Sequence, residues 1–253
     1  MSKPNVYIIN KGSIGVADPA SNLGEGAFSN QTTVGLIEYE KEGAKKYMLV
    51  DTGMAADWDT ILKGLEEHGK KEDVTYLLVT HWDQDHMQNI KEFPGALVVS
   101  GISTARVGTD DFGMVNALYP NGYIENEAIR FKNVNRTHSR DEMIYIVDSE
   151  NQGKVAFIGD LLFAPLAELP AEQAVMFDKM ATIDIGQKYF VLKDLFEKNT
   201  DIQKFFVGHS GTILDREEIA DAIKAMESSV YKEAIKELVQ QLEEKAEKYK
   251  NLL

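Results

Sequence analysis

The sequence predicts one α/β domain that spans residues 1–253, in which buried strands alternate with helices. Nearly continuous apolar runs such as VTYLLVT (74–80) are typical of strands that are buried on both faces. An amphipathic pattern at helical spacing follows other strands. The length and the 43% hydrophobic content suffice for a sizeable core, and no repeat or linker divides the chain.

The expected elements can be placed from the residue types within them and from the turn-forming residues between them. β-branched and aromatic runs predict eight strands, at 5–10, 33–40, 47–53, 74–80, 96–101, 142–148, 154–160 and 205–211. The charged EKEGAKK (40–46) and the SENQG stretch predict hairpin turns. Trp58, Ile61 and Leu65 predict a helix near 57–68, and Gly, Asn, Asp and Pro between 102 and 128 predict a loop-rich stretch.

The last part of the chain, residues 216–253, is expected to be a helical extension. Asp215 and Glu218 have the spacing of a capping box at its start. An apolar stripe then recurs at helical spacing, at Ile219, Ile223, Met226, Val230, Ile235, Leu238, Leu242 and Tyr249. The stripe either packs on the sheet or projects and supports a homodimer.

The composition excludes several classes of function. The 27 Lys and Arg against 41 Asp and Glu give a net charge of −14, which repels nucleic acid and anionic membranes. There is no cysteine, so disulfides, thiolate metal sites and cysteine nucleophiles are absent. We find no apolar leader and no run of about 18 apolar residues. We therefore expect a cytoplasmic protein that acts on a small molecule.

Possible metal ligands concentrate where predicted strands end. His81, Asp83, Asp85 and His86 share one stretch, HWDQDH, directly after the strand at 74–80. The other candidates also lie at strand ends: His138 before the predicted hairpin, Asp160 at its end and His209 after the last strand. Side chains at such strand ends can converge on one site. His68, in contrast, has the surroundings of a solvated helix end.

Taken together, these motifs resemble those of the metallo-β-lactamase superfamily. VDTG (50–53), THWDQDH (80–86), THS (137–139), FIGDLLF (157–163) and VGHSG (207–211) follow one another in its order and approximate spacing. The resemblance covers about residues 5–215. It implies a four-layer αββα sandwich with a two-metal site in a cleft at one edge.

The resemblance also implies roles for individual residues. The implied ligands are His81, Asp83 and His138 for one metal, Asp85, His86 and His209 for the other, and Asp160 as a bridge. Asp51 would not bind metal but would orient the metal-binding loop. Asp85 would also accept or deliver a proton. Two divalent ions about 3.5–4 Å apart can hold a bridging hydroxide at neutral pH.

Asp83 departs from the family, because the usual motif has histidine there. A third carboxylate makes the site less positive, so its bound water should be less acidic and a hydrolytic pH optimum more alkaline. Histidine and carboxylate ligands without sulfur suit zinc, and zinc is the metal that we expect. The added oxygen ligand of Asp83 makes iron or manganese an alternative. Flavodiiron proteins, for example, have a carboxylate there and use iron. Alternatively, Asp83 is only a polar loop residue in a site that retains the second metal.

Three functions remain open. The first is a dinuclear metallohydrolase of a small ester, lactone, thioester or amide, because the chain lacks a basic patch and its region after Asp160 resembles lactonase and glyoxalase-type members. The second is an iron-dependent redox or oxygen-handling enzyme, suggested by Asp83. The third is a metal-binding scaffold with little catalysis.

Overall fold

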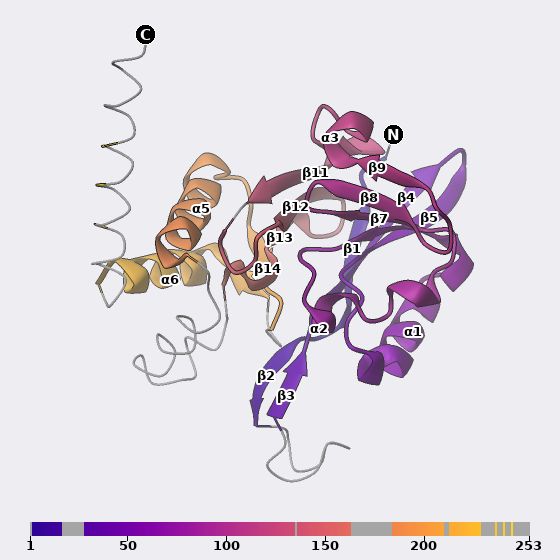
Figure 1. Cartoon of the computed structure of the whole chain (residues 1–253), viewed down its shortest axis with the longest axis horizontal. Coiled ribbons are helices and arrows are strands. Elements are labelled where there is room, and N and C mark those ends of the chain that lie inside the picture. Colours follow the sequence, from indigo (N-terminus) through magenta and orange to yellow (C-terminus); the bar gives the residue numbers. More distant parts are fainter. Residues whose placement is uncertain are drawn as a thin grey trace.

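The computed structural model describes residues 2–16, 28–134, 136–162, 184–209 and 213–228, together with Lys236, Gln240 and Glu244. Within these residues, two β-sheets lie face to face, and helices cover their outer faces (Figure 1). A small two-stranded sheet, β2 (Ser13–Val16) and β3 (Phe28–Gln31), stands apart from the other two.

The first large sheet has seven strands in the order β1-β4-β5-β6-β7-β8-β9. Their bounds are β1 (Asn5–Asn10), β4 (Val34–Lys41), β5 (Ala44–Val50), β6 (Val74–Leu78), β7 (Leu97–Ser100), β8 (Ser103–Arg106) and β9 (Phe112–Met114). Strands β5, β6 and β7 are parallel to one another, so their carboxyl ends lie at the same edge.

The second large sheet has six strands in the order β10-β11-β12-β13-β14-β15. Their bounds are β10 (Tyr123–Ile124), β11 (Asn126–Val134), β12 (Glu142–Ser149), β13 (Gly153–Phe157), β14 (Lys204–Phe206) and β15 (Leu214–Asp215). Only β13 and β14 form a parallel pair within this sheet. Their carboxyl ends therefore share an edge as well.

The central strands, such as β6, β7 and β12, are mostly apolar because both of their faces are buried. In β6, for example, Tyr76 and Leu78 pack between the sheets, whereas Leu77 packs on the opposite face beneath α1 (Trp58–Glu66). The outer face of the second sheet packs against α5 (Ile185–Lys198) and α6 (Arg216–Ser228). Alternate residues of a strand point to opposite faces, which produces this division. The expected four-layer αββα arrangement is confirmed.

Short helical segments complete the described chain. They are η1 (Ala55–Asp57), η2 (Lys71–Asp73), α2 (Gln84–Met87), η3 (Ile90–Glu92), α3 (Val115–Leu118) and η4 (Gly159–Leu161). None of the helices in the described part combines the length and the apolarity that a membrane span requires.

The stretch 102–128 is more regular than its composition predicted. It contains β8, β9, α3 and β10, and β11 begins at Asn126. The residues of β11 are mostly only half buried, so their pattern is weak, but six of them pair with β12. Pairing with a well-buried neighbour can impose a strand on a sequence with little strand character of its own.

The predicted capping box is present at the start of α6. The Asp215 backbone N–H donates to Glu218 Oε2 at 2.7 Å, and the Glu218 N–H donates to Asp215 Oδ1 at 2.9 Å. Ile219, Ile223 and Met226 are buried against the second sheet. The remainder of the predicted stripe lies outside the described residues. The homodimer contact and the single-domain assignment therefore stay predictions.

Candidate metal centre

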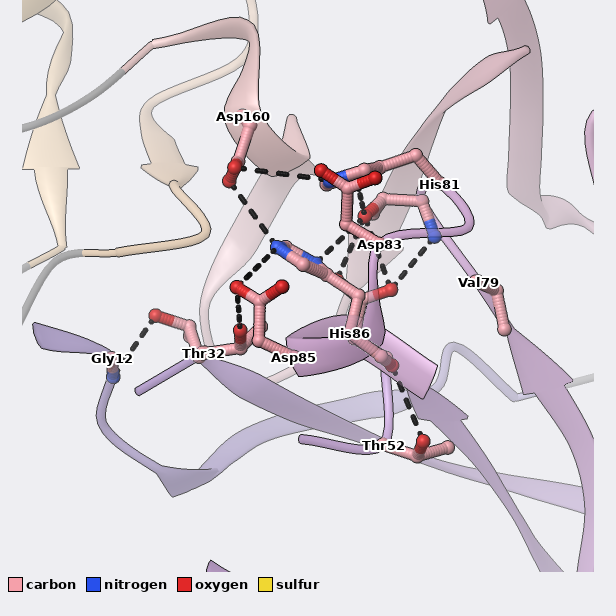
Figure 2. Close-up of polar contacts among 12 residues, drawn as sticks. Gly12, Thr32, Thr52, Val79, His81, Asp83, Asp85, His86 and Asp160 are labelled. Carbon is pink, nitrogen blue, oxygen red and sulfur yellow. Dashed lines mark hydrogen bonds and ion pairs between the residues drawn. The ribbon is translucent and has the colours of Figure 1, made fainter. Parts of the chain in front are cut away.

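The histidines and carboxylates expected to bind metal lie together where parallel strands end. His81, Asp85 and His86 follow β6, Asp160 lies in η4 after β13, and His209 follows β14. The loop between β11 and β12 brings His138 to the same place. Figure 2 shows the carboxylates of Asp83, Asp85 and Asp160 pointing toward the imidazoles of His81 and His86.

Asp51 holds the loop that carries the clustered ligands. It follows β5 in a left-handed conformation (φ 59°) and is 2% exposed. Its carboxylate accepts hydrogen bonds from the Thr80 backbone N–H at 2.7 Å, the Thr80 hydroxyl at 2.8 Å and His86 Nδ1 at 2.8 Å. The Thr80 oxygen also lies 3.1 Å from His81 Nδ1. Asp51 thus fixes the loop backbone and, through two side-chain contacts, the directions of His81 and His86.

His81, Asp83 and His138 form a first group whose ligand atoms converge. Asp83 Oδ2 lies 3.1 Å from His138 Nε2 and 3.5 Å from His81 Nε2. His81 is fully buried, whereas the Asp83 side chain is 57% exposed. The group therefore combines histidines that are mostly buried with one carboxylate at the surface.

Asp85, His86 and His209 form a second group, in which both histidines are buried and Asp85 is mostly buried. Asp85 Oδ2 lies 3.1 Å from His209 Nε2 and 3.6 Å from His86 Nε2. His209 Nδ1 donates to the Gln31 carbonyl at 3.0 Å, as His86 Nδ1 does to Asp51. Because both Nδ1 atoms are hydrogen-bonded away from the centre, both Nε2 atoms face it and can bind metal once they are deprotonated.

Asp160 lies between the two groups. Its Oδ2 is 3.5 Å from His138 Nε2 and 3.2 Å from His209 Nε2, and its Oδ1 is 3.4 Å from His86 Nε2. The approach depends on Gly208, since a Cβ there would lie 2.0 Å from Asp160 Oδ1 and 3.0 Å from a carbon of the His86 ring. The glycine of the VGHSG motif therefore has a steric function at this centre.

The donor atoms fit divalent ions. Four ligands at about 2.1 Å around a tetrahedral ion stand about 3.4 Å apart. The neighbouring donors within each group lie 3.1–3.6 Å apart. His81 Nε2, His86 Nε2 and Asp160 Oδ1 are buried and have no hydrogen-bond partner. Leaving buried polar atoms unsatisfied is costly, and one ion bound in each group would satisfy all three.

The charges of the centre shift the pKa of Asp83, Asp160 and His209 toward the ionised form. Hydrogen bonding with His138 and His81 holds the pKa of Asp83 well below its usual range. Burial raises the pKa of Asp160, but the neighbouring His209 and His86 outweigh it and the net pKa is far below normal. Burial lowers the pKa of His209, but Asp160 and Asp85 raise it to about 10. Such strongly perturbed, mutually coupled groups are typical of functional sites.

Several supporting residues were not identified from the sequence. Asn30 and Thr32 donate to Asp85 Oδ2 at 3.1 and 3.3 Å. Glu142, fully buried at the start of β12, accepts from the Thr137 hydroxyl and, at 3.2 Å, from the His138 backbone N–H. These residues come from ordinary polar stretches, and only the fold brings them to the ligands.

His68 is the one histidine outside the centre. It lies beyond the end of α1, where its ring stacks on Tyr7 with centroids 3.9 Å apart. Its partial burial differs from the solvated helix end that we expected.

Comparisons with known proteins agree with this fold. The family model of the metallo-β-lactamase superfamily matches residues 29–110, which include the HWDQDH stretch. No curated protein sequence matches the chain. Three solved structures illustrate the similarity. A protein from Thermotoga maritima assigned as a metallo-β-lactamase is 16% identical, with a TM-score of 0.55 over 84% of this chain and 99% of that one.

The second structure is a variant of AiiA from B. thuringiensis with N-decanoyl-L-homoserine bound at its active site. It is 18% identical, with a TM-score of 0.50 over 83% of this chain and 94% of that one. The third, rubredoxin:oxygen oxidoreductase from Desulfovibrio gigas, is 13% identical, with a TM-score of 0.56 over 87% of this chain but only 58% of that one. The family model thus supports the resemblance to the metallo-β-lactamase superfamily over residues 29–110, and the three solved structures share the fold.

Proposed function

We propose that this chain of the metallo-β-lactamase superfamily is a dinuclear metallohydrolase that acts on a small ester, lactone, thioester or amide. One observation carries the proposal: seven histidine and carboxylate side chains converge in two groups with Asp160 between them. Such a centre could hold two ions side by side. Divalent ions held there would lower the pKa of a bound water and polarise the substrate carbonyl.

The protein's own side chains have separate tasks in this proposal. Asp160 lies between both groups, where its carboxylate could contact an ion in each, and Asp51 fixes the proton of His86 on Nδ1 so that Nε2 can bind metal. Asp85, in addition to binding metal, is proposed to accept or deliver a proton during turnover. The nearby amide of Asn30 and hydroxyl of Thr32 keep its carboxylate directed at the centre.

Two observations guide the choice of substrate class: the net charge of the chain and the fold that it shares with AiiA. The net charge of −14 disfavours nucleic acid as a substrate. AiiA shares the fold and was solved with an acyl-homoserine in its active site, so lactones are the first class to test. The fold alone does not determine the reaction, because one fold hosts many chemistries.

An iron-dependent redox enzyme is the second candidate. The observation in its favour is Asp83, whose carboxylate oxygen lies among the ligand atoms of the first group and suits a harder ion. The oxidoreductase from D. gigas shares the fold, but this chain spans only 58% of its length. A redox role would therefore need electrons from a separate partner.

The test is the metal content and visible spectrum of protein purified without chelator, followed by assays on lactone, thioester and phosphodiester substrates. About two zinc or manganese ions per chain with lactone or thioester turnover support hydrolysis. A visible iron band without hydrolysis favours redox chemistry. One metal or none, with no turnover, favours a scaffold.

A pair of histidine variants controls this test. His86→Ala removes a buried ligand and should abolish metal retention and turnover together. His68→Ala changes the histidine that stacks on Tyr7 outside the centre and should leave both intact. If His86→Ala lost its metal but kept full turnover, the assigned centre would not be the active site.

A further inference from the structure

The two ligand groups differ in how firmly the protein holds them. In the second group the side chains are nearly inaccessible, with exposed fractions of 0% for His86, 2% for His209 and 13% for Asp85. In the first group Asp83 is 57% exposed. Asp160 is shared by both groups, so the difference in exposure lies between Asp83 in the first group and Asp85 in the second.

One segment, residues 30–33, holds the second group in place. Asn30 and Thr32 donate to Asp85, and the Gln31 carbonyl accepts from His209 Nδ1. The segment is itself fixed, because the Thr33 backbone N–H donates to the Gly208 carbonyl at 2.6 Å. Asp85 and His209 are thus oriented before any ion binds.

Asp83 has no comparable support. Within the described part of the chain, its carboxylate contacts only His81 and His138, which are themselves candidate ligands. It precedes α2 but forms no side-chain cap with that helix. Its exposed carboxylate must therefore lose water and side-chain freedom when an ion binds, and both losses cost free energy.

The charges of the ligands themselves do not distinguish the groups. Each has two histidines and one carboxylate of its own, and both face Asp160. The remaining differences are burial and preorganisation, and both favour the second group. Attraction between an ion and a carboxylate is stronger away from water, and folding has already oriented Asp85.

We propose that the centre fills in a fixed order, in which Asp85, His86 and His209 bind the first divalent ion tightly and the group containing Asp83 binds the second weakly and exchangeably. The inference rests on the two-metal centre of the proposed function, but not on the reaction. It assigns Asn30 as a positioning residue for the tight site and Asp83 as the determinant of the weak one.

The test is a calorimetric titration of chelator-stripped protein with Zn²⁺. The wild-type chain should show two binding events whose dissociation constants differ at least about tenfold. Asp83→Ala should remove the weak event and leave the tight constant within about threefold. Asn30→Ala should weaken the tight event about tenfold, the lower end of the effect of losing a hydrogen bond to a ligand. Circular dichroism spectra and melting curves confirm that each variant is folded.

Two equal binding events, or loss of the tight event in Asp83→Ala, would overturn the order. Absence of any Zn²⁺ binding by the wild-type chain would overturn both this inference and the proposed function. Ordered binding in a protein that hydrolyses none of the substrates would leave the inference standing and refute only the proposed reaction.

Discussion

The variant Asp51→Asn tests whether Asp51 orients the metal ligand His86 or only stabilises the fold. The amide keeps the shape of Asp51, and its oxygen can still accept from the Thr80 backbone N–H, which donates at 2.7 Å. Its NH₂ group, however, would face His86 Nδ1, which lies 2.8 Å from the present carboxylate. The amide would then donate to Nδ1 and place the imidazole proton on Nε2, where metal must bind.

The expected cost appears mainly in metal binding. Loss of such a supporting contact lowers metal affinity about 10–100-fold, which equals about 1.4–2.8 kcal/mol. With zinc in excess, the loaded protein loses that much ligand stabilisation. For a chain of this length, the melting temperature of the loaded protein should fall about 3–11 °C further than that of the stripped protein.

The assay is thermal unfolding of both forms, with and without chelator. Asp73→Asn is the matched control, because it also removes a carboxylate charge but only from a contact with Lys46, 2.7 Å away and distant from the centre. It should change the stripped and loaded melting temperatures equally. If Asp51→Asn also lowered both equally, Asp51 would be stabilising the fold without controlling the proton of His86.

Two further outcomes are expected. In Gly208→Ala the added methyl would lie 2.0 Å from Asp160 Oδ1, so bound metal should fall more than about tenfold. Elemental analysis measures the metal content. A wild-type metal content would show that the backbone can shift to accommodate the methyl group. In metal-free protein the raised pKa of His209, about 10, contributes stability that is complete below its unfolded pKa of about 6.5 and is lost as pH rises through 10. Metal competes with these protons, so the gain in melting temperature on loading should grow between pH 6.5 and 10, and a constant or shrinking gain would contradict the proton competition.

The candidate ligands could be predicted because their chemistry is local or falls at strand ends. His81, Asp83, Asp85 and His86 share one short stretch after β6, and the apolar run before them identifies the strand. Parallel strands place such ends at one edge, so their convergence with Asp160 follows from general geometry. The apolar strands likewise predicted sheets buried on both faces, which β6 shows in its division between two packing layers.

Other features depend on contacts between residues distant in sequence. The strand β11 forms because it pairs with β12, although its own residues gave a weak pattern. The antiparallel pair of β2 and β3, which we did not predict, brings Asn30 within 3.1 Å of Asp85 across 55 positions of the chain. A hydrophobic periodicity in the sequence cannot predict a contact between two side chains so far apart in the chain.

The sequence by itself determined which residues could bind metal and which edge of the sheets would carry them, because residue chemistry and strand periodicity are local. Only the tertiary structure decided how unequal the two ligand groups are. Asp83 and Asp85 differ by two positions, yet one side chain is 57% exposed and the other 13%. The physical reason is that burial and hydrogen bonding depend on what the rest of the chain packs against each carboxylate, and only Asp85 meets the segment at residues 30–33.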